Sequence, residues 1–225
     1  MKFVATTAVP FSPVTAGPAD VAWTPAISLD CTQAFVRIPG MGLWMPPTDY
    51  TLEFWCFSTG WGPSAAFNMA DDEDGRNRVL AHLPWTDGRL YFDSGNLSTT
   101  GRLHQPMPGT FMYQWHHLAL QVDSQAPAMR LFLDGQLYAA TTATDTFKPR
   151  PVDFLIGLSQ PGQLGEFRLW NYVRTPAEIQ ADMPRVLATS RPGLVGCWRL
   201  DDTLAPGGRI QDRSGYGRHG TLNRR

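Results

Sequence analysis

The chain has 225 residues, of which 43% are hydrophobic and 17% are charged, a balance that excludes a disordered chain and a coiled coil. Its formal net charge of -1 excludes a general binder of the nucleic-acid backbone, which needs clustered positive charge. The sequence contains no run of about 18 apolar residues, so no membrane span is expected.

Turn-forming residues are abundant, with 21 glycines and 19 prolines, and they separate short apolar runs along the chain. This spacing is typical of many short strands joined by turns. The three cysteines are Cys31, Cys56 and Cys197, and an odd number cannot all pair within one chain. We therefore expect free, buried thiols, which suit a reducing compartment.

Residues 1–25 are rich in Pro, Ala and Thr, which predicts an extended N-terminal arm ahead of the folded domain. The first residues hold one lysine and a short, weakly apolar stretch that Pro10 and Pro13 interrupt, so they make a poor secretory signal. We expect cytoplasmic synthesis. Export by a non-classical route and assembly into a particle both stay open.

After the arm, short runs rich in apolar and aromatic residues predict one strand after another. In residues 51–57, Leu52, Phe54 and Cys56 fall on one face of a strand, and residues 115–122 alternate in the same way. Further strands are predicted at 89–92, 129–133, 136–138, 154–157 and 166–170.

Two local signals define a hairpin and a helix. Asp134 and Gly135 stand between two apolar runs, which favours the type I′ turn of a two-residue hairpin. Residues 175–178 read Thr-Pro-Ala-Glu, a capping box with Pro at the first helical position, and predict one short helix near residues 176–187. One helix among many strands predicts an all-β fold, namely a two-sheet antiparallel jelly-roll β-sandwich.

Three longer segments follow one another along the chain and carry a family resemblance. They are residues 115–120 (WHHLAL), 131–135 (LFLDG) and 165–179 (GEFRLWNYVRTPAEI). Taken together, they resemble the laminin-G-like, concanavalin-A-like lectin/glucanase jelly-roll family, which includes the pentraxins. The similarity extends over residues 26–222 and implies a single sandwich domain at residues 26–225.

The end of the chain carries a further part of this resemblance. Residues 193–222 resemble a segment that, in many related bacterial chains, precedes the one that residues 26–39 resemble. We expect segment 193–222 to fold back and close the sandwich, because Leu194, Trp198 and Leu200 need a partner sheet to bury them. The alternative is that the chain is one unit cut from an array.

The resembled family includes glycosidases, so paired carboxylates are the first catalytic signal to seek. Its laminarinase-type members carry Glu-x-Asp-x-x-Glu on one strand, and retaining hydrolysis needs two carboxyl groups about 5 Å apart. The glutamates, none of which has that spacing, are Glu53, Glu73, Glu166 and Glu178. His116 and His117 are adjacent, so on a strand they point to opposite faces and do not predict a zinc site. We expect no enzyme.

The resemblance also implies a candidate calcium site at an edge of the sandwich, beside the ligand. The loop that would form a pentraxin-type site, residues 158–164, holds no carboxylate. A second candidate lies in residues 71–77, where four acids in a row repel one another unless a cation or arginines neutralise them. The alternative is a solvated loop paired with Arg76 and Arg78. The candidate calcium ligands are Asp71, Asp72, Asp74 and Asn77.

Three tryptophans, Trp44, Trp61 and Trp85, lie in predicted loops. A loop tryptophan stacks well on the apolar face of a sugar ring, and Asp93 and Asn96 are candidates to hydrogen-bond the sugar's hydroxyl groups. The alternative is that these tryptophans pin long loops onto the sandwich or fill a subunit interface.

The sequence therefore predicts a non-catalytic module that recognises carbohydrate or a glycoprotein surface through loops at one edge. This step from fold to ligand is an analogy, because such sandwiches host unrelated functions. The alternative is a structural or assembly subunit of a larger protein particle, in which the arm 1–25 docks on a neighbour. A protein partner or a homo-oligomer is then expected, whereas nucleic acid is not.

Overall fold

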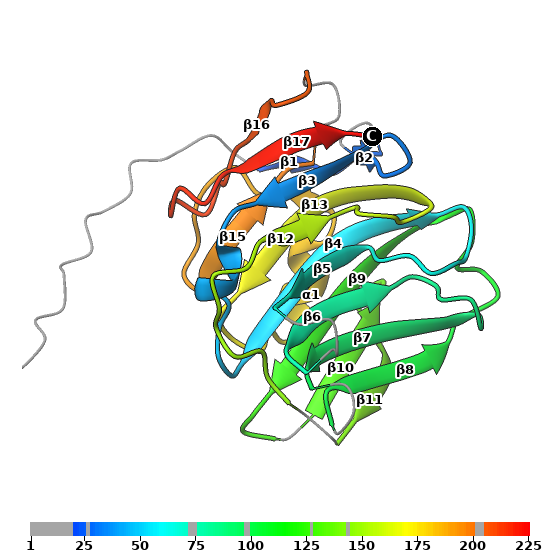
Figure 1. The fold of residues 1–225 in the computed structure, drawn as a ribbon. Coiled ribbons are helices and arrows are strands. Elements are labelled where there is room, and N and C mark those ends of the chain that lie inside the picture. Colours follow the sequence, from blue (N-terminus) through cyan, green and yellow to red (C-terminus); the bar gives the residue numbers. More distant parts are fainter. Residues whose placement is uncertain are drawn as a thin grey trace, which may run out of the picture.

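The short alternating runs form two large antiparallel sheets that pack face to face (Figure 1). The computed structural model describes residues 20–25, 28–71, 76–96, 100–126, 128–142, 145–200 and 205–225. The expected fold class, an all-β antiparallel sandwich with one short α-helix, is confirmed within these ranges.

The first sheet, called the β4 sheet, has the strand order β11–β10–β9–β4–β13–β15, and β2 also pairs with β13. Asp134 and Gly135 connect β10 to β11 with φ values of 50° and 74°, so both have the positive φ of the predicted type I′ turn. The strands are β2 (Ser28–Asp30), β4 (Tyr50–Ser58), β9 (Trp115–Asp123), β10 (Ala128–Leu133), β11 (Gln136–Thr141), β13 (Gly162–Trp170) and β15 (Leu194–Trp198).

The second sheet, called the β7 sheet, has the order β16–β17–β3–β12–β5–β6–β7–β8, and the short 3₁₀ helix η1 (Met41–Leu43) follows β3. Its strands are β3 (Ala34–Ile38), β5 (Phe67–Ala70), β6 (Arg78–His82), β7 (Arg89–Gly95), β8 (Arg102–Pro106), β12 (Phe154–Ile156), β16 (Arg209–Ile210) and β17 (Gly220–Arg224). The C-terminal segment adds a strand to each sheet, since β15 pairs with β13 and β17 pairs with β3.

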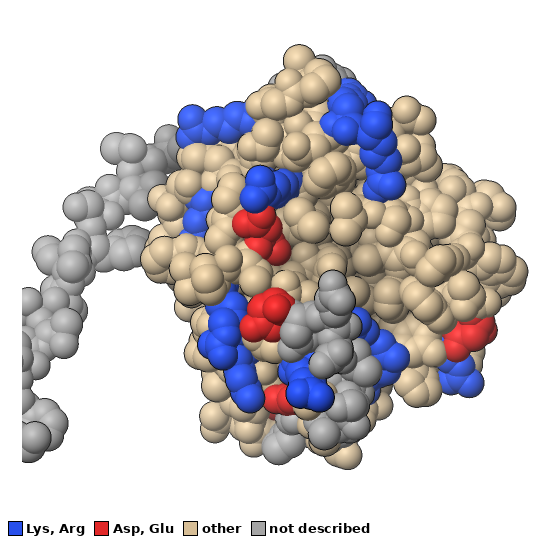
Figure 2. All heavy atoms as spheres, in the orientation of Figure 1, with Lys and Arg blue, Asp and Glu red and all other residues tan. Residues whose placement is uncertain are grey.

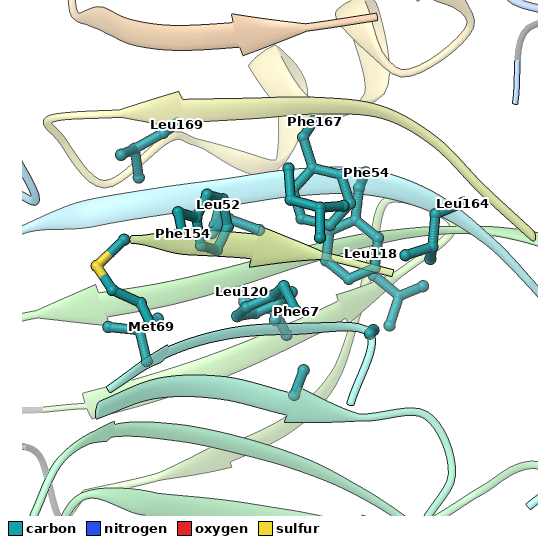
Figure 3. Close-up of a cluster of buried hydrophobic side chains, with 14 of the residues drawn as sticks. Leu52, Phe54, Phe67, Met69, Leu118, Leu120, Phe154, Leu164, Phe167 and Leu169 are labelled. Carbon is teal, nitrogen blue, oxygen red and sulfur yellow. The ribbon is translucent and has the colours of Figure 1, made fainter. Parts of the chain in front are cut away.

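The core between the sheets is built on aromatic rings from both layers (Figure 3). Phe54 and Phe167 of the β4 sheet stack with their centroids 4.4 Å apart. Phe67 of the β7 sheet meets both rings edge to face at 5.7 Å, and Phe154 of the same sheet meets Phe167 edge to face at 6.0 Å. Each fully buried phenylalanine contributes roughly 1.5–3 kcal/mol through removal of apolar surface from water. This cluster therefore holds the two sheets together.

A further layer covers the outer face of the β4 sheet. It consists of α1 (Pro176–Asp182) and a ribbon of β1 (Val21–Ala22) and β14 (Arg185–Val186). The predicted capping box starts α1, with Glu178 N donating to Thr175 Oγ1 at 3.2 Å and Thr175 N donating to Glu178 Oε2 at 2.7 Å. The helix is shorter than the expected 176–187, because Pro184 lacks the amide donor needed to continue it. Within the described ranges, no helix has both the length and the apolar character to span a membrane.

Buried charges lie between this layer and the β4 sheet. Glu53 is fully buried on β4, and its Oε1 accepts a hydrogen bond from Arg174 Nη1 at 2.7 Å. Arg174 Nη2 also donates to Asp182 Oδ2 of α1 at 2.5 Å. Arg168 of β13 donates from Nε to Glu166 at 2.7 Å and lies 3.6 Å from Glu53. We call these five side chains the Glu53 network. Each member has an oppositely charged partner, as buried charges require.

Residues 20–25, the last part of the predicted arm 1–25, pack on the domain itself. Trp23 stacks on Trp55 of β4 with ring centroids 4.2 Å apart and meets the ring of Trp115 at 5.0 Å. Asp20 pairs with Arg191 in the segment after β14. These residues therefore belong to the layer over the β4 sheet, while residues 1–19 lie outside the described ranges.

Replacing Arg174 by alanine is expected to destabilise the protein strongly, because it leaves Glu53 buried without its main partner. Breaking a buried pair from one side costs about 3–5 kcal/mol of unfolding free energy. A matched control is Arg130→Ala, which breaks a pair with Asp123 whose side chains are 24% and 14% exposed. That loss should be about 1 kcal/mol or less. Urea unfolding measures the free energy of unfolding of both variants. If Arg174→Ala loses no more of it than Arg130→Ala, the Glu53 network does not hold the layer of α1, β1 and β14 on the β4 sheet.

His117 makes stability depend on pH. Burial, reinforced by Arg168 and Arg174, lowers the pKa of His117 well below its usual value of 6.5, so the folded protein holds this ring neutral. The unfolded chain gains a proton below pH 6.5 and the folded chain does not, so this contribution to stability is lost as pH falls from 6.5. The limiting slope is about 1.4 kcal/mol per pH unit. Chemical unfolding between pH 7 and about 5 measures this contribution. The unfolding free energy of His117→Gln should fall less steeply with decreasing pH than that of the wild type. Equal slopes for the two proteins would show that His117 is not the cause of the pH dependence.

Candidate functional site

The outer face of the β7 sheet, which faces the viewer in Figure 1, has no counterpart to the layer of α1, β1 and β14 among the described residues. Along β6, β7 and β8, alternate side chains point into the core and away from it. Register brings the outward positions together: Tyr91 lies opposite His82, and Asp93 lies opposite Arg102. Figure 2 shows charged side chains on this side in small neighbouring groups of opposite sign, with most of the surface uncharged.

A pocket of about 380 Å³ opens on this face. Its described lining comes from three adjacent strands and the connection between β6 and β7. We call it the Trp85 pocket. The lining residues are Arg78, His82, Trp85, Tyr91 and Arg102.

The floor of the Trp85 pocket is an ion cluster built around one carboxylate. Asp93 is fully buried, and Arg102 donates to it from Nε at 2.6 Å and from Nη2 at 2.8 Å. Arg78 Nη2 donates to the same carboxylate. The two arginine side chains remain 18% and 30% exposed, so they reach from the buried acid toward solvent. The cluster holds two positive charges and one negative charge.

Rings form the wall of the pocket. The His82 ring lies 4.2 Å from the Trp85 ring and 6.0 Å from the Tyr91 ring, measured between centroids. The guanidinium of Arg102 lies 4.8 Å from the centroid of the Tyr91 ring, a cation–π arrangement. Tyr91 also donates its hydroxyl proton to Asp87 at 2.7 Å. The aromatic surfaces are therefore held in fixed orientations.

Protonation states in the pocket follow from these contacts. Burial lowers the pKa of His82 below its usual value, so the ring is neutral at neutral pH. Its Nδ1 lies against the carbonyl oxygen of Ser64 and donates to it, which leaves Nε2 as a hydrogen-bond acceptor. Burial and the hydrogen bond to Asp87 raise the pKa of Tyr91, so its phenol stays protonated. The pocket thus offers guanidinium donors, one imidazole acceptor and apolar ring faces.

The predicted sugar-contacting residues are not all in one place. Trp85 lines the pocket, and Trp61 is 59% exposed beside the same turn, with its Cζ3 3.7 Å from the position of a Cβ on Gly88. Trp44 is 56% exposed and lines a separate hollow of about 400 Å³ near the loop that follows η1. Asn96 lies at the end of β7, where its backbone N–H donates to Asp145 at 2.9 Å.

The role expected of Asp93 needs correction. The prediction has this carboxylate hydrogen-bonding sugar hydroxyls, but it is completely buried and both of its oxygens accept from arginines. A sugar cannot reach it while those bonds are in place. Asp93 instead orients Arg78 and Arg102, which are the groups that face the pocket.

Sequence reasoning missed four of the five lining residues, namely Arg78, His82, Tyr91 and Arg102. Each occupies an outward position in a strand whose neighbours point inward. The residues flanking them, such as Val79, Ala81, Leu90 and Leu103, are buried. Outward polar residues are ordinary on the solvated face of an antiparallel sheet, so this alternation did not distinguish the pocket from the rest of the face.

The candidate calcium loop is only partly described. Asp71 accepts from Asn77 Nδ2 at 3.0 Å and pairs with Arg150 at 3.3 Å. Asn77 is buried and also exchanges hydrogen bonds with the backbone of Lys148 at 2.6 and 2.8 Å. Asp72 and Asp74 lie outside the described residues, within which no group of three or more His, Cys, Asp or Glu side chains is placed to hold a metal. Calcium therefore stays a prediction. The alternative was that arginines neutralise the acids of this loop, and of the two arginines named for that role, Arg78 pairs with Asp93.

Comparison with known protein families identifies the fold. A laminin G family model described as the concanavalin A-like lectin/glucanases superfamily matches residues 30–180, which is more than half of the chain. The chain belongs to this superfamily. The resemblance drawn from residues 115–120, 131–135 and 165–179 is thereby confirmed. No curated protein sequence matches the chain.

Two solved structures share this superfamily fold with the chain. One is a "putative carbohydrate binding protein" from Bacteroides ovatus, with a TM-score of 0.59 and 17% identity. The match covers 92% of this chain and 59% of that protein, so the chain spans well under two thirds of its length. The other is domain 4 of an extracellular GH43 arabinanase from Geobacillus stearothermophilus, in complex with arabinotriose. It has a TM-score of 0.54 and 20% identity, and the match covers 73% of this chain and 81% of that one.

Proposed function

We propose that the chain is a non-catalytic module that binds carbohydrate in the Trp85 pocket. The observation that carries this proposal is the pocket itself, which combines an aromatic wall with guanidinium donors on the open face of the β7 sheet. Sugar rings have an apolar face and a rim of hydroxyl groups. A site for them needs a flat aromatic surface and a few fixed polar groups, and the pocket supplies both.

The solved structures support a binding role without assigning a ligand. The Bacteroides ovatus protein is named for carbohydrate binding, and the arabinanase domain holds an arabinotriose. At 17% and 20% identity these likenesses concern the fold. The ligand therefore has to be argued from the pocket of this chain.

The carboxylates around the pocket favour binding over catalysis. Glycoside hydrolysis uses two carboxyl groups about 5–10 Å apart that can exchange protons with the substrate. Among the described residues that line the pocket there is no carboxylate. Asp93 beneath it is held by two arginines, and Asp87 beside it accepts from Tyr91. The hydrogen bond from Tyr91 lowers the pKa of Asp87, so this carboxyl group is poorly suited to act as a general acid.

The test is binding of a panel of soluble oligosaccharides by calorimetry, with wild type, Trp85→Ala and Trp44→Ala. Trp85→Ala should weaken binding by about tenfold or more, because it removes the largest ring surface of the pocket. Trp44→Ala removes an exposed tryptophan from the separate hollow and should leave affinity unchanged. Near-ultraviolet circular dichroism confirms that both variants are folded.

Each result of this experiment has a definite meaning. Loss of binding in Trp44→Ala alone would move the site away from the Trp85 pocket, and absence of binding to every saccharide would reject the proposed function. Running each titration in millimolar Ca²⁺ and in EDTA tests the calcium prediction. Binding that needs Ca²⁺ would direct attention to Asp71 and Asn77, which Asp71→Asn would then probe.

A second candidate function, a subunit that assembles with copies of itself, rests on a different surface. Leu43, Trp44 and Tyr216 are 53%, 56% and 62% exposed. The guanidinium of Arg218 lies 4.7 Å from the Trp44 ring and 4.4 Å from the Tyr216 ring, so it joins them into one patch. Exposed apolar groups gathered in one place are typical of protein contact sites.

Light scattering after size exclusion tests this candidate. If the patch joins copies, the wild type runs as an oligomer and Trp44→Ala as a monomer, because the substitution removes the largest apolar side chain of the patch. A chain that starts at Asp20 serves as the control for the arm and should keep the oligomer, since Asp20 and Trp23 remain. A monomeric wild type at high concentration would reject the assembly function.

A further inference from the structure

The two arginines of the Trp85 pocket bond directly to only one carboxylate. A further carboxylate, that of Asp145, lies beside Gly95, the cross-strand neighbour of Arg78, and accepts from the backbone N–H groups of Asn96 and Thr146. Arg78 and Arg102 share a single carboxylate, that of Asp93, so the cluster has a net charge of +1. The next ion pair on the same face, Arg89 with Asp87 at 3.7 Å, is balanced within itself. His82 adds no charge because its ring is neutral.

The arginines are also arranged to bind something besides Asp93. The carboxylate engages Nε and Nη2 of Arg102, and neither bond uses its Nη1. The Asp93 carboxylate accepts from Nη2 of Arg78. The Nε of Arg78 is buried and has no hydrogen-bond partner among the described residues. An unpaired buried N–H is costly, and a guanidinium satisfies its donors best with anionic oxygen atoms.

We propose that the saccharide bound in the Trp85 pocket carries an anionic oxygen group, a carboxylate or a sulfate, which Arg78 and Arg102 bind while the sugar ring packs on Trp85. This inference rests on the proposed carbohydrate-binding function and names the class of sugar. A neutral sugar would leave the directly bonded cluster of Arg78, Arg102 and Asp93 with its net positive charge.

The geometry of the site strengthens this anion preference. Asp93 fixes Arg102 through two parallel hydrogen bonds, so little side-chain entropy is lost when the same guanidinium takes a second partner. The ring of Tyr91 under Arg102 shields the charge from water on one side. Partly buried charges are screened less by salt than exposed ones. Arg102 is thus held in place before the ligand arrives.

The test compares saccharides that differ only in charge. An oligogalacturonate is paired with its neutral methyl ester, and a sulfated oligosaccharide with its desulfated form. At least one charged member should bind about tenfold or more tightly than its neutral partner, as charge-assisted hydrogen bonds require. Its affinity should fall as salt rises from about 50 to 500 mM, whereas the neutral partner's affinity should not.

Two variants locate the effect. Arg102→Gln removes one charge and can still donate to Asp93, so it should abolish the preference for the charged saccharide. Arg89→Gln removes the same charge from a neighbouring residue that is paired with Asp87, and it should keep the preference. If Arg102→Gln does not fold, the salt series on the wild type still decides the question.

The possible failures are distinguishable. Neutral saccharides that bind as tightly as charged ones, or a preference that Arg89→Gln removes as readily as Arg102→Gln, would overturn the anionic ligand while the carbohydrate-binding function stands. If no saccharide of either charge binds, the proposed function itself falls.

Discussion

The buried carboxylate of Glu53 holds in place the layer that covers one outer face of the sandwich. A two-sheet sandwich has two outer faces, and either could in principle be open. Here Glu53 lies on the outer face of the β4 sheet, where it must have a positive partner. Arg174 supplies that charge and also binds Asp182, which ties α1 to the sheet. The layer of α1, β1 and β14 covers part of this face and leaves a hollow of about 350 Å³ between β9–β11 and the start of α1. The outer face of the β7 sheet has no such layer among the described residues.

The same chemistry operates on the β7 sheet with the opposite result. Asp93 is as completely buried as Glu53, and its charge too is paired with two arginines. In the Glu53 network the arginines are buried with their acids, so the charges only hold parts of the chain together. At Asp93 the arginines extend to the surface. One buried acid therefore stabilises a covering layer, and the other presents guanidinium groups to solvent.

Local features were predictable from the sequence because their causes are local. The Asp134–Gly135 turn and the capping box at Thr175 each depend on a few consecutive residues, and both are present. The predicted helix is too long, since it continues to residue 187 along an apolar stripe, whereas the helix ends at Asp182 just before Pro184. The Trp85 pocket could not be assembled this way: Arg78 and Arg102 are 24 residues apart, and only the register of β6, β7 and β8 brings them to one carboxylate. A pattern of outward polar residues predicts a solvated face, but not which side chains meet on it.

The stack of Trp23 on Trp55 has a consequence for how the domain could be connected. Because Trp23, Asp20 and the β1–β14 ribbon lie on the covered face, the polypeptide joins the sandwich on the side opposite the Trp85 pocket. Anything that precedes Asp20 starts its path there. If a further domain or a surface were joined to the chain at this end, the outer face of the β7 sheet would lie on the opposite side of the sandwich from that junction.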